Sequence, residues 1–184
     1  MQKKLLAALA IVAGAVFVFW NTRSEPTPAA PRAPCENPVK TEIREVRGTS
    51  LTGLVEPGED VKLLVNFYDC NPILRGDIVA YQYRGNPNPI IKVVYGLPGD
   101  RFELRPLNGG WNVAVNGGIL KNSEGVPFLL GGGEYRILSL YEHDYDGLLP
   151  GGAYLILGNL PAGSLDSSRF GFVSKNDIIG KVIQ

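Results

Sequence analysis

The 184-residue sequence contains a single histidine, His143, and only two cysteines, Cys35 and Cys70. One histidine excludes a multi-histidine metal site, and the cysteines lack the CxxC spacing of a zinc site, so no metal and no cofactor is expected. His143 lies in a run of acidic residues, 142–146, which is typical of a solvated loop. The sequence therefore gives little support for a catalytic histidine.

The sequence also has no net charge, because 18 basic residues balance 18 acidic ones. Nothing in this balance indicates nucleic acid as a partner. Clean helical periods are missing after residue 20, whereas 23 glycines and 14 prolines are spread along the chain, which favours a turn-rich β protein. The length suits one domain plus an appendage. A domain of this size can bury a hydrophobic core without stabilising disulfides or metal ions.

The N-terminus is short and basic over residues 1–4, and Leu5 to Trp20 carries neither charge nor proline. A helix of this length spans about 24 Å, somewhat less than a bilayer core of about 30 Å. A cleaved signal peptide and a buried helix are alternatives. We favour a transmembrane anchor over residues 5–20, with Lys3 and Lys4 snorkelling at one interface and Trp20 at the other. The chain after Trp20 is then exported.

Residues 21–38 contain five prolines and predict an extended tether. Cys35 lies in this tether, on the exported side, where disulfides persist. A bridge between Cys35 and Cys70 would close a loop of about 35 residues and contribute about 3 kcal/mol to stability. Two independent thiols are an equal alternative.

Residues 39–184 are predicted to form the exported catalytic β domain. Asn116-Gly117 predicts a tight hairpin turn, and Ser164 to Arg169 a short helical turn or loop, which Asp166 and Arg169 would brace as an ion pair. The predicted strands are Lys40 to Val46, Val61 to Phe67, Asp77 to Tyr83, Pro89 to Tyr95, Arg101 to Arg105, Trp111 to Val115, Gly118 to Leu120, Glu134 to Tyr141, Ala153 to Leu157, Phe170 to Val173 and Ile178 to Val182.

Two residues in this domain suggest chemistry. Ser50 lies in a small-residue loop, Arg47 to Leu51, and Lys92 lies in the apolar run Ile90 to Val94. A serine hydroxyl needs a base to become a nucleophile, and a lysine becomes that base only when burial lowers its pKa. Lys92 on an outward, solvated strand face, charged and inert, is the alternative that this pattern leaves open.

Five stretches, in this order, resemble the type I signal peptidases, which are membrane-anchored Ser-Lys serine endopeptidases. They are GTSLTGLVEPGEDV, RGDIVAY, IIKVVYGLPGD, NVAVNGGIL and LGNLPAGSLDSSRFGFV, and they span most of residues 47–182. By this resemblance Ser50 falls on the nucleophile and Lys92 on the general base. The resemblance implies a mainly β fold, a compact antiparallel and barrel-like sheet, with one N-terminal transmembrane helix.

The resemblance assigns further roles. Ser164 falls on the serine that hydrogen-bonds the catalytic lysine. Gly48 falls where some members carry a serine whose hydroxyl helps the oxyanion hole, so the oxyanion would depend on the Ser50 backbone N–H, with another amide or a water as the alternative second donor. The pockets for small substrate residues would be lined by Leu51, Val55, Ala80 and Ile91.

The sequence departs from the family pattern in two places. Gly53-Leu54 replaces a Pro-Thr pair after the nucleophile. In the last motif Asn159 replaces an aspartate, Leu160-Pro161 replaces Asn-Arg, and Ser168 takes the place of an arginine. These changes affect the bracing of loops more than the reacting groups.

The implied function is removal of signal peptides from exported preproteins after small residues, Ala-x-Ala. The partners would be preproteins and the lipid bilayer, with a monomeric, single-pass protein in the plasma or inner membrane. A specialised peptidase of the same fold that processes a pilin or conjugation substrate is one alternative. A non-catalytic exported domain that binds peptides is another. A self-cleaving repressor is disfavoured, because no DNA-binding helical domain is indicated.

Overall fold

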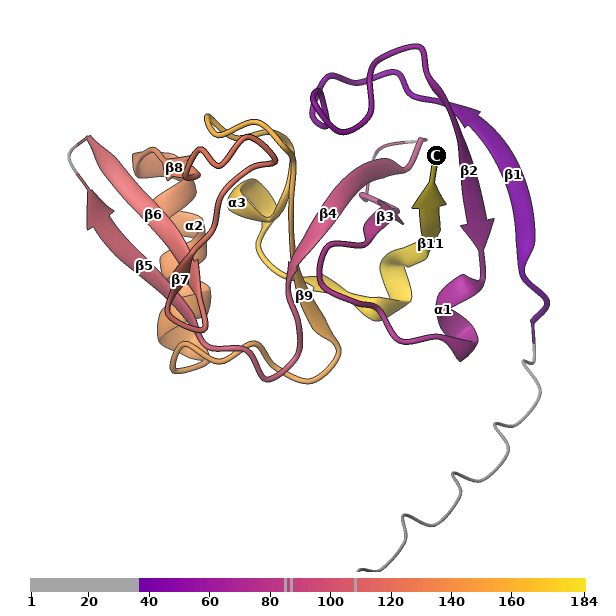
Figure 1. The fold of residues 1–184 in the computed structure, drawn as a ribbon. Coiled ribbons are helices and arrows are strands. Elements are labelled where there is room, and N and C mark those ends of the chain that lie inside the picture. The colour runs from indigo at the N-terminus through magenta and orange to yellow at the C-terminus, as the bar shows by residue number, and fades with distance from the viewer. Residues whose placement is uncertain (1–36, 85, 87, 108) are drawn as a thin grey trace, which may run out of the picture. The chain divides into compact units, whose positions relative to one another are not determined.

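The computed structural model describes residues 37–184 apart from 85, 87 and 108, and Figure 1 shows their arrangement. The anchor predicted over residues 5–20, most of the tether and Cys35 lie outside the described residues. Among the helices that are described, none has the length and apolar character needed to cross a membrane.

The larger of two sheets has seven strands, and every neighbouring pair in it is antiparallel. Its order is β1-β2-β11-β3-β4-β9-β10, so the C-terminal strand lies in the interior of the sheet. The strands are β1 (Lys40–Glu45), β2 (Asp60–Val65), β11 (Ile178–Ile183), β3 (Ile78–Tyr81), β4 (Ile90–Gly96), β9 (Ala153–Leu157) and β10 (Val173–Ser174).

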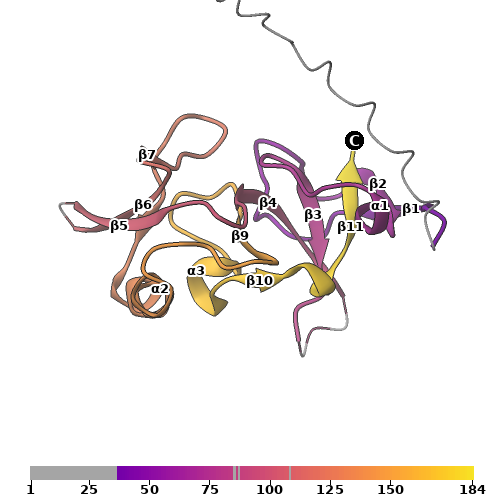
Figure 2. The ribbon, with the colours of Figure 1, turned by 90° about the horizontal axis from the view of Figure 1, so that it is seen from below.

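The smaller sheet is inserted between β4 and β9 in the chain, and helix α2 (Gly132–Asp144) lies on one side of it (Figures 1 and 2). Its strands are β5 (Phe102–Leu107), β6 (Gly110–Val115), β7 (Gly118–Ile119) and β8 (Leu129–Leu130). Three short helical segments complete the fold: α1 (Phe67–Cys70), α3 (Ser167–Phe170) and a 3-10 turn (Lys175–Asp177).

The predicted fold class is confirmed as mainly β and antiparallel, but the barrel-like closure is wrong. Within the described residues the seven-stranded sheet has two edges, β1 and β10, and strands β5 to β8 pair with one another in a sheet of their own. The strands of the smaller sheet are therefore not available to close the larger one.

The strand predicted over Glu134 to Tyr141 is also wrong, because this segment forms α2. Glutamate, arginine and leucine favour helix, and three inward side chains follow a spacing of three residues. Tyr135 stacks on Trp111 at 4.0 Å between ring centroids, Leu138 is fully buried, and the Tyr141 ring lies 4.8 Å from that of Phe172. Packing against Trp111 of the small sheet and against Phe172, which precedes β10, thus favours the helix.

Two turns are formed by residues with positive φ angles. The hairpin predicted at Asn116-Gly117 is confirmed, since both residues have positive φ (51° and 81°) between β6 and β7, as a tight primed turn requires. The predicted strand through Phe67 ends earlier, because Asn66 has a φ of 63° and leads into α1.

Strand β4 has apolar packing on both faces. Ile90 and Val94 pack in one core cluster, whereas Ile91 and Val93 pack in another. Because successive side chains of a strand point to opposite faces, a strand covered on both sides has a continuous apolar sequence. Lys92 is the one charged residue in this strand.

Candidate active site

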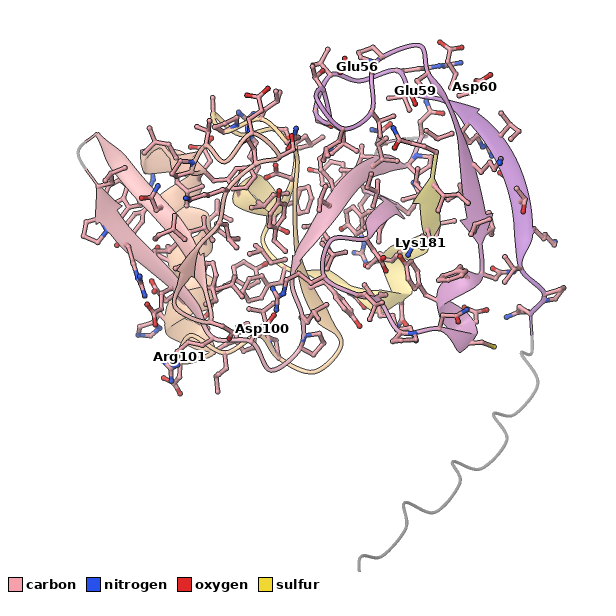
Figure 3. The ribbon with its side chains drawn as sticks, viewed as in Figure 1. Glu56, Glu59, Asp60, Asp100, Arg101 and Lys181 are labelled. Carbon is pink, nitrogen blue, oxygen red and sulfur yellow. The ribbon has the colours of Figure 1, made fainter. Side chains whose placement is uncertain are left out.

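Ser50 lies in the turn that connects β1 to β2. Leu51 O accepts backbone hydrogen bonds from Leu54 N at 2.8 Å and from Val55 N at 3.0 Å. The side chains of Leu51 and Val55 are buried in the core and fix the turn to the sheet. Farther along, Glu56 and Glu59, labelled in Figure 3, each accept a backbone N–H within the same loop. The loop that carries Ser50 is therefore fixed by its own contacts.

Asn159, in the loop after β9, ties this turn to the rest of the domain. Its backbone N–H donates to Ser50 O at 2.6 Å, and its side-chain Nδ2 donates to Thr52 O and to Ser123 Oγ, both at 2.8 Å. Its Oδ1 accepts from Ser123 N at 2.9 Å. An aspartate at this position lacks the donor that Thr52 O requires. The sequence showed only that this residue departs from the family pattern.

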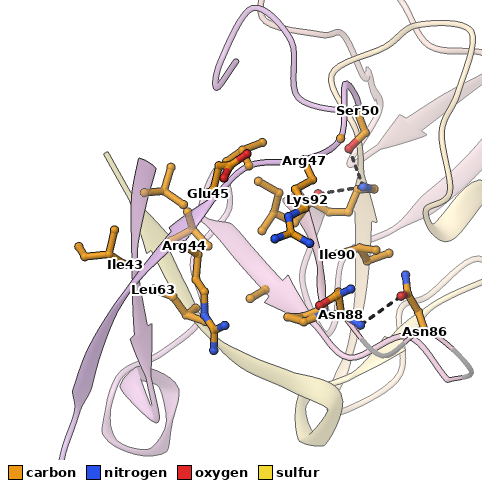
Figure 4. Close-up of a pocket in the computed structure, with 17 residues that line it drawn as sticks. Ile43, Arg44, Glu45, Arg47, Ser50, Leu63, Asn86, Asn88, Ile90 and Lys92 are labelled. Atoms are coloured by element: carbon orange, nitrogen blue, oxygen red, sulfur yellow. Dashed lines mark hydrogen bonds between the residues drawn. The ribbon is translucent and has the colours of Figure 1, made fainter. Parts of the chain in front are cut away.

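Lys92 is 3% exposed, which excludes the alternative of an outward, solvated side chain. Its Nζ is hydrogen-bonded to Ser50 Oγ at 2.8 Å and donates to Ile91 O at 2.8 Å (Figure 4). Burial lowers the pKa of Lys92 from 10.5 to about 8, and the negative charge of Asp166 opposes part of that shift. The structure thus brings together the two residues that the sequence singled out.

The edge of β4 beside this pair is open. On one side, residues 90–93 pair with β3, but on the other side the pairing with β9 begins only at Val93, opposite Leu157. The chain then leaves the sheet through Gly158 and Asn159 toward the Ser50 turn. Residues 90–92 therefore have no strand partner on this side among the described residues, and the backbone of Ile91, whose O accepts from Lys92 Nζ, lies at the open edge near Ser50.

Asp166 is the centre of a buried polar cluster behind Lys92, and it is 1% exposed. Its carboxylate accepts four hydrogen bonds, from Gly158 N at 2.9 Å, Ser164 Oγ at 2.7 Å, Ser168 N at 2.9 Å and Ser168 Oγ at 2.7 Å. The predicted ion pair with Arg169 is wrong, since Arg169 lies 3.7 Å from Glu134 instead. Ser168, in the place of the family's arginine, satisfies the carboxylate with neutral donors.

Ser164 lies close to the Ser50 turn. A Cβ on Gly158 would come within 2.4 Å of Ser164 Oγ and 2.7 Å of Ser50 O, so only glycine fits between them. Ser164 Oγ donates to Asp166, and no hydrogen bond joins it to Lys92 among the described residues. Its role toward the lysine stays a prediction.

The surroundings of Gly48 are open, with no atom within 4 Å of a Cβ built there. Across the described part of the chain, the backbone N–H of Ser50 donates to no acceptor. One backbone donor is thus available beside the Ser50 hydroxyl, and Gly48 adds none from its side chain.

A cavity of about 580 Å³ borders Ser50 and Lys92 (Figure 4). Two of the four predicted pocket residues, Ala80 and Ile91, line it, whereas Leu51 and Val55 are buried in the adjoining core and do not. The lining residues are Ile43, Arg44, Glu45, Val46, Arg47, Gly48, Ser50, Val61, Leu63, Ala80, Asn86, Asn88, Pro89, Ile90, Ile91, Lys92 and Val182.

Comparison with known proteins identifies the family. The model of the family described as signal peptidase, peptidase S26, matches residues 39–184. The chain belongs to this signal peptidase family. Its membership confirms the resemblance that the ordered motifs indicated, and it supports assignment of the chain to the peptidases.

Curated members of the signal peptidase family resemble the chain over most of its length. It is 34% identical over 142 residues to signal peptidase I of Bacillus caldolyticus, covering 74% of each chain. It is 27% identical over 147 residues to signal peptidase IB of Staphylococcus aureus, covering 74% of this chain and 73% of the relative. A crystal structure of a signal peptidase I from Enterococcus faecalis V583 matches with a TM-score of 0.43 and 26% identity, covering 61% of this chain and 98% of that one.

Proposed function

We propose that the chain is a signal peptidase of the type I kind, which cuts preproteins after small residues with Ser50 as nucleophile and Lys92 as general base. The observation that carries the proposal is the 2.8 Å hydrogen bond between Lys92 Nζ and Ser50 Oγ. The lowered pKa of Lys92, about 8, leaves a useful fraction of neutral amine near neutral pH.

The substrate would bind as an extended peptide along the open edge of β4, at residues 90–92. Small side chains at the P1 and P3 positions would enter the apolar part of the cavity at Ala80 and Ile91. Leu51 and Val55 form the floor behind this surface, since they pack in the same core cluster as Ala80. This arrangement supports the Ala-x-Ala preference.

In the first half-reaction, neutral Lys92 directs one N–H at Ile91 O and its lone pair at the Ser50 hydroxyl. Lys92 takes the hydroxyl proton as Ser50 Oγ attacks the scissile carbonyl. The Ser50 backbone N–H would stabilise the oxyanion that forms. The ammonium of Lys92 then gives its proton to the leaving amine, the C–N bond breaks and an acyl-enzyme remains.

In the second half-reaction, Lys92 takes a proton from a water molecule, which attacks the ester carbon. The bond to Ser50 Oγ breaks, and the proton returns from Lys92 to the serine. The signal peptide then carries the new carboxylate, and the mature chain has already left as the amine.

The proposal includes the placement inferred from the sequence: an anchor at residues 5–20, Lys3 and Lys4 on the cytoplasmic side, and the catalytic domain on the exported face of the plasma or inner membrane. The protein would act as a monomer on exported preproteins at the bilayer surface. A tether of residues 21–38 would hold the site near the membrane, where the cleavage site of a preprotein emerges.

Cleavage of a preprotein by the full-length chain in detergent tests the proposal. The wild type should release the mature protein with a new N-terminus after Ala-x-Ala, as read by mass spectrometry. Ser50→Ala and Lys92→Met should each lose about 10³-fold or more in kcat. Equal cleavage by all three chains would refute the dyad, and absence of cleavage by the wild type would favour a peptide-binding domain without catalysis.

A further inference from the structure

Arg47 is the exposed residue of the cavity wall that lies three positions before Ser50. Its side chain extends from the segment after β1 into the cavity, on the side where Lys92 and Asn88 are seen (Figure 4). The residue before it, Val46, is buried in the core. Both residues border the cavity, Val46 with a buried side chain and Arg47 with an exposed one.

Among the described residues, none of the charged groups around the cavity forms an ion pair with Arg47. Arg44, on the same wall, pairs with Glu42 at 2.5 Å. Lys92 is bonded to Ser50 Oγ and Ile91 O, and the nearby carboxylate of Asp166 is satisfied by its own four donors.

Glu45 is the carboxylate in the cavity wall, and it forms no ion pair with Arg47. Across the part of the chain that the structure describes, the Arg47 guanidinium makes no hydrogen bond or ion pair. Its donors are free for a ligand.

A guanidinium presents a planar fork of N–H donors that matches a carboxylate. An extended peptide presents successive side chains to opposite faces, so small residues that enter the apolar part of the cavity alternate with residues that face outward. The outward residue nearest the scissile bond is P2. Arg47 borders the cavity and is exposed, so its guanidinium lies on the solvent side of the cavity, where the outward residue of a bound peptide would pass.

We propose that Arg47 determines specificity at the residue between the two small ones, and selects substrates that carry an acidic side chain at P2. This inference rests on the proposed function, since it concerns the choice among peptides that Ser50 cuts. The substrate class is thus narrower than Ala-x-Ala, namely preproteins with Ala-Glu-Ala or Ala-Asp-Ala before the cleavage site.

Three peptides that differ only at P2, with Glu, Gln or Lys between alanines, test the inference on the full-length chain. The wild type should cut the Glu peptide with a kcat/KM about fivefold above the Gln peptide, and the Lys peptide most slowly. The preference should weaken at about 0.5 M salt, which screens exposed charges. Arg47→Glu should reverse the order of the Glu and Lys peptides.

Arg105→Glu is the matched control, because it makes the same charge change at a residue of the small sheet that lines no part of the cavity. It should keep the wild-type order. Equal kcat/KM for all three peptides, or an unchanged order in Arg47→Glu, overturns the inference and leaves the proposed function standing. Failure of the wild type to cut any peptide overturns both.

Discussion

In the proposed mechanism Lys92 sets the pH dependence of the reaction, because only its neutral form would accept the Ser50 proton. Burial lowers the pKa of Lys92 to about 8, so the neutral fraction increases as the pH rises through that value. We expect kcat/KM to increase with pH along a single-proton limb centred near 8, and to level off above it. Initial rates between about pH 6 and 9.5 check this. A rate that still rises about tenfold per pH unit at pH 9.5 would contradict the burial argument, because a lysine with its ordinary pKa of 10.5 is still mostly charged there.

The lowered pKa of Lys92 also makes the free energy of unfolding depend on pH. Between its folded pKa of about 8 and its unfolded value of 10.5, Lys92 binds more protons in the unfolded state. Stability contributed by this group therefore rises with pH across that window. We expect the free energy of unfolding of the wild type, relative to Lys92→Met, to increase from about pH 7 to pH 9. Subtracting the variant removes the contribution of the tyrosines. A difference that is flat with pH would show that the lysine titrates normally.

Gly48 is a residue at which the site can be improved. A side chain there meets open space, and serine would place a hydroxyl near the Ser50 N–H, the donor proposed for the oxyanion. We expect Gly48→Ser to raise kcat by about tenfold with little change in KM, since the added hydrogen bond acts on the transition state. Gly151→Ser, at an equally open glycine far along the chain, is the control. An unchanged kcat in Gly48→Ser would indicate that another group already completes the oxyanion hole.

Among the elements, the loop after β9 makes direct hydrogen bonds to the turn that carries Ser50. Asn159 in this loop bonds the backbone on both sides of the Ser50 turn, at Ser50 O and Thr52 O. We expect Asn159→Asp, which removes the donor to Thr52 O, to lower kcat by about 10- to 100-fold while KM changes little. Steady-state kinetics measure this split. Asn176→Asp, in the exposed 3-10 turn, should behave as the wild type. A loss confined to KM in Asn159→Asp would place the residue in substrate binding instead.

Comparison of elements shows which features the sequence could predict. Strands β4 and β9 were predictable because their apolar runs end at turn residues, and β4 needs apolar residues on both faces. Helix α2 was not, because its inward side chains contact rings such as Trp111 and Phe172 that lie far away in sequence.

The features of the candidate site also fall into those that the sequence could predict and those that it could not. Ser50 and Lys92 were predictable from composition and motif order, and the structure brings them together. The bracing by Asn159 and the satisfaction of Asp166 by neutral donors were not, because they depend on contacts between loops distant in sequence. The sequence also gave no reason to single out Arg47, because exposed arginines are common. Only its position in the cavity wall distinguishes it from the others.

At the scale of the whole molecule, the covalent state of the cysteines is a testable prediction. Cys70 is the last residue of α1, and Cys35 lies outside the described residues. If the two are bonded, the bridge restricts the unfolded chain, and reduction should lower the free energy of unfolding by about 3 kcal/mol. Denaturant unfolding with and without reductant measures this, with Cys35→Ser as the control that should show no response. Two alkylated thiols in the non-reduced, denatured chain would contradict the bridge.

Identification of the acylated residue tests the central claim most directly. A peptide ester that ends in Ala-x-Ala should acylate the full-length wild type faster than water removes the acyl group, so that rapid quenching traps the adduct. Mass spectrometry should locate the added mass on Ser50 in the wild type, and Lys92→Met should show none on the same timescale. An adduct on another residue, or turnover without any adduct on Ser50, would contradict the Ser50-Lys92 mechanism.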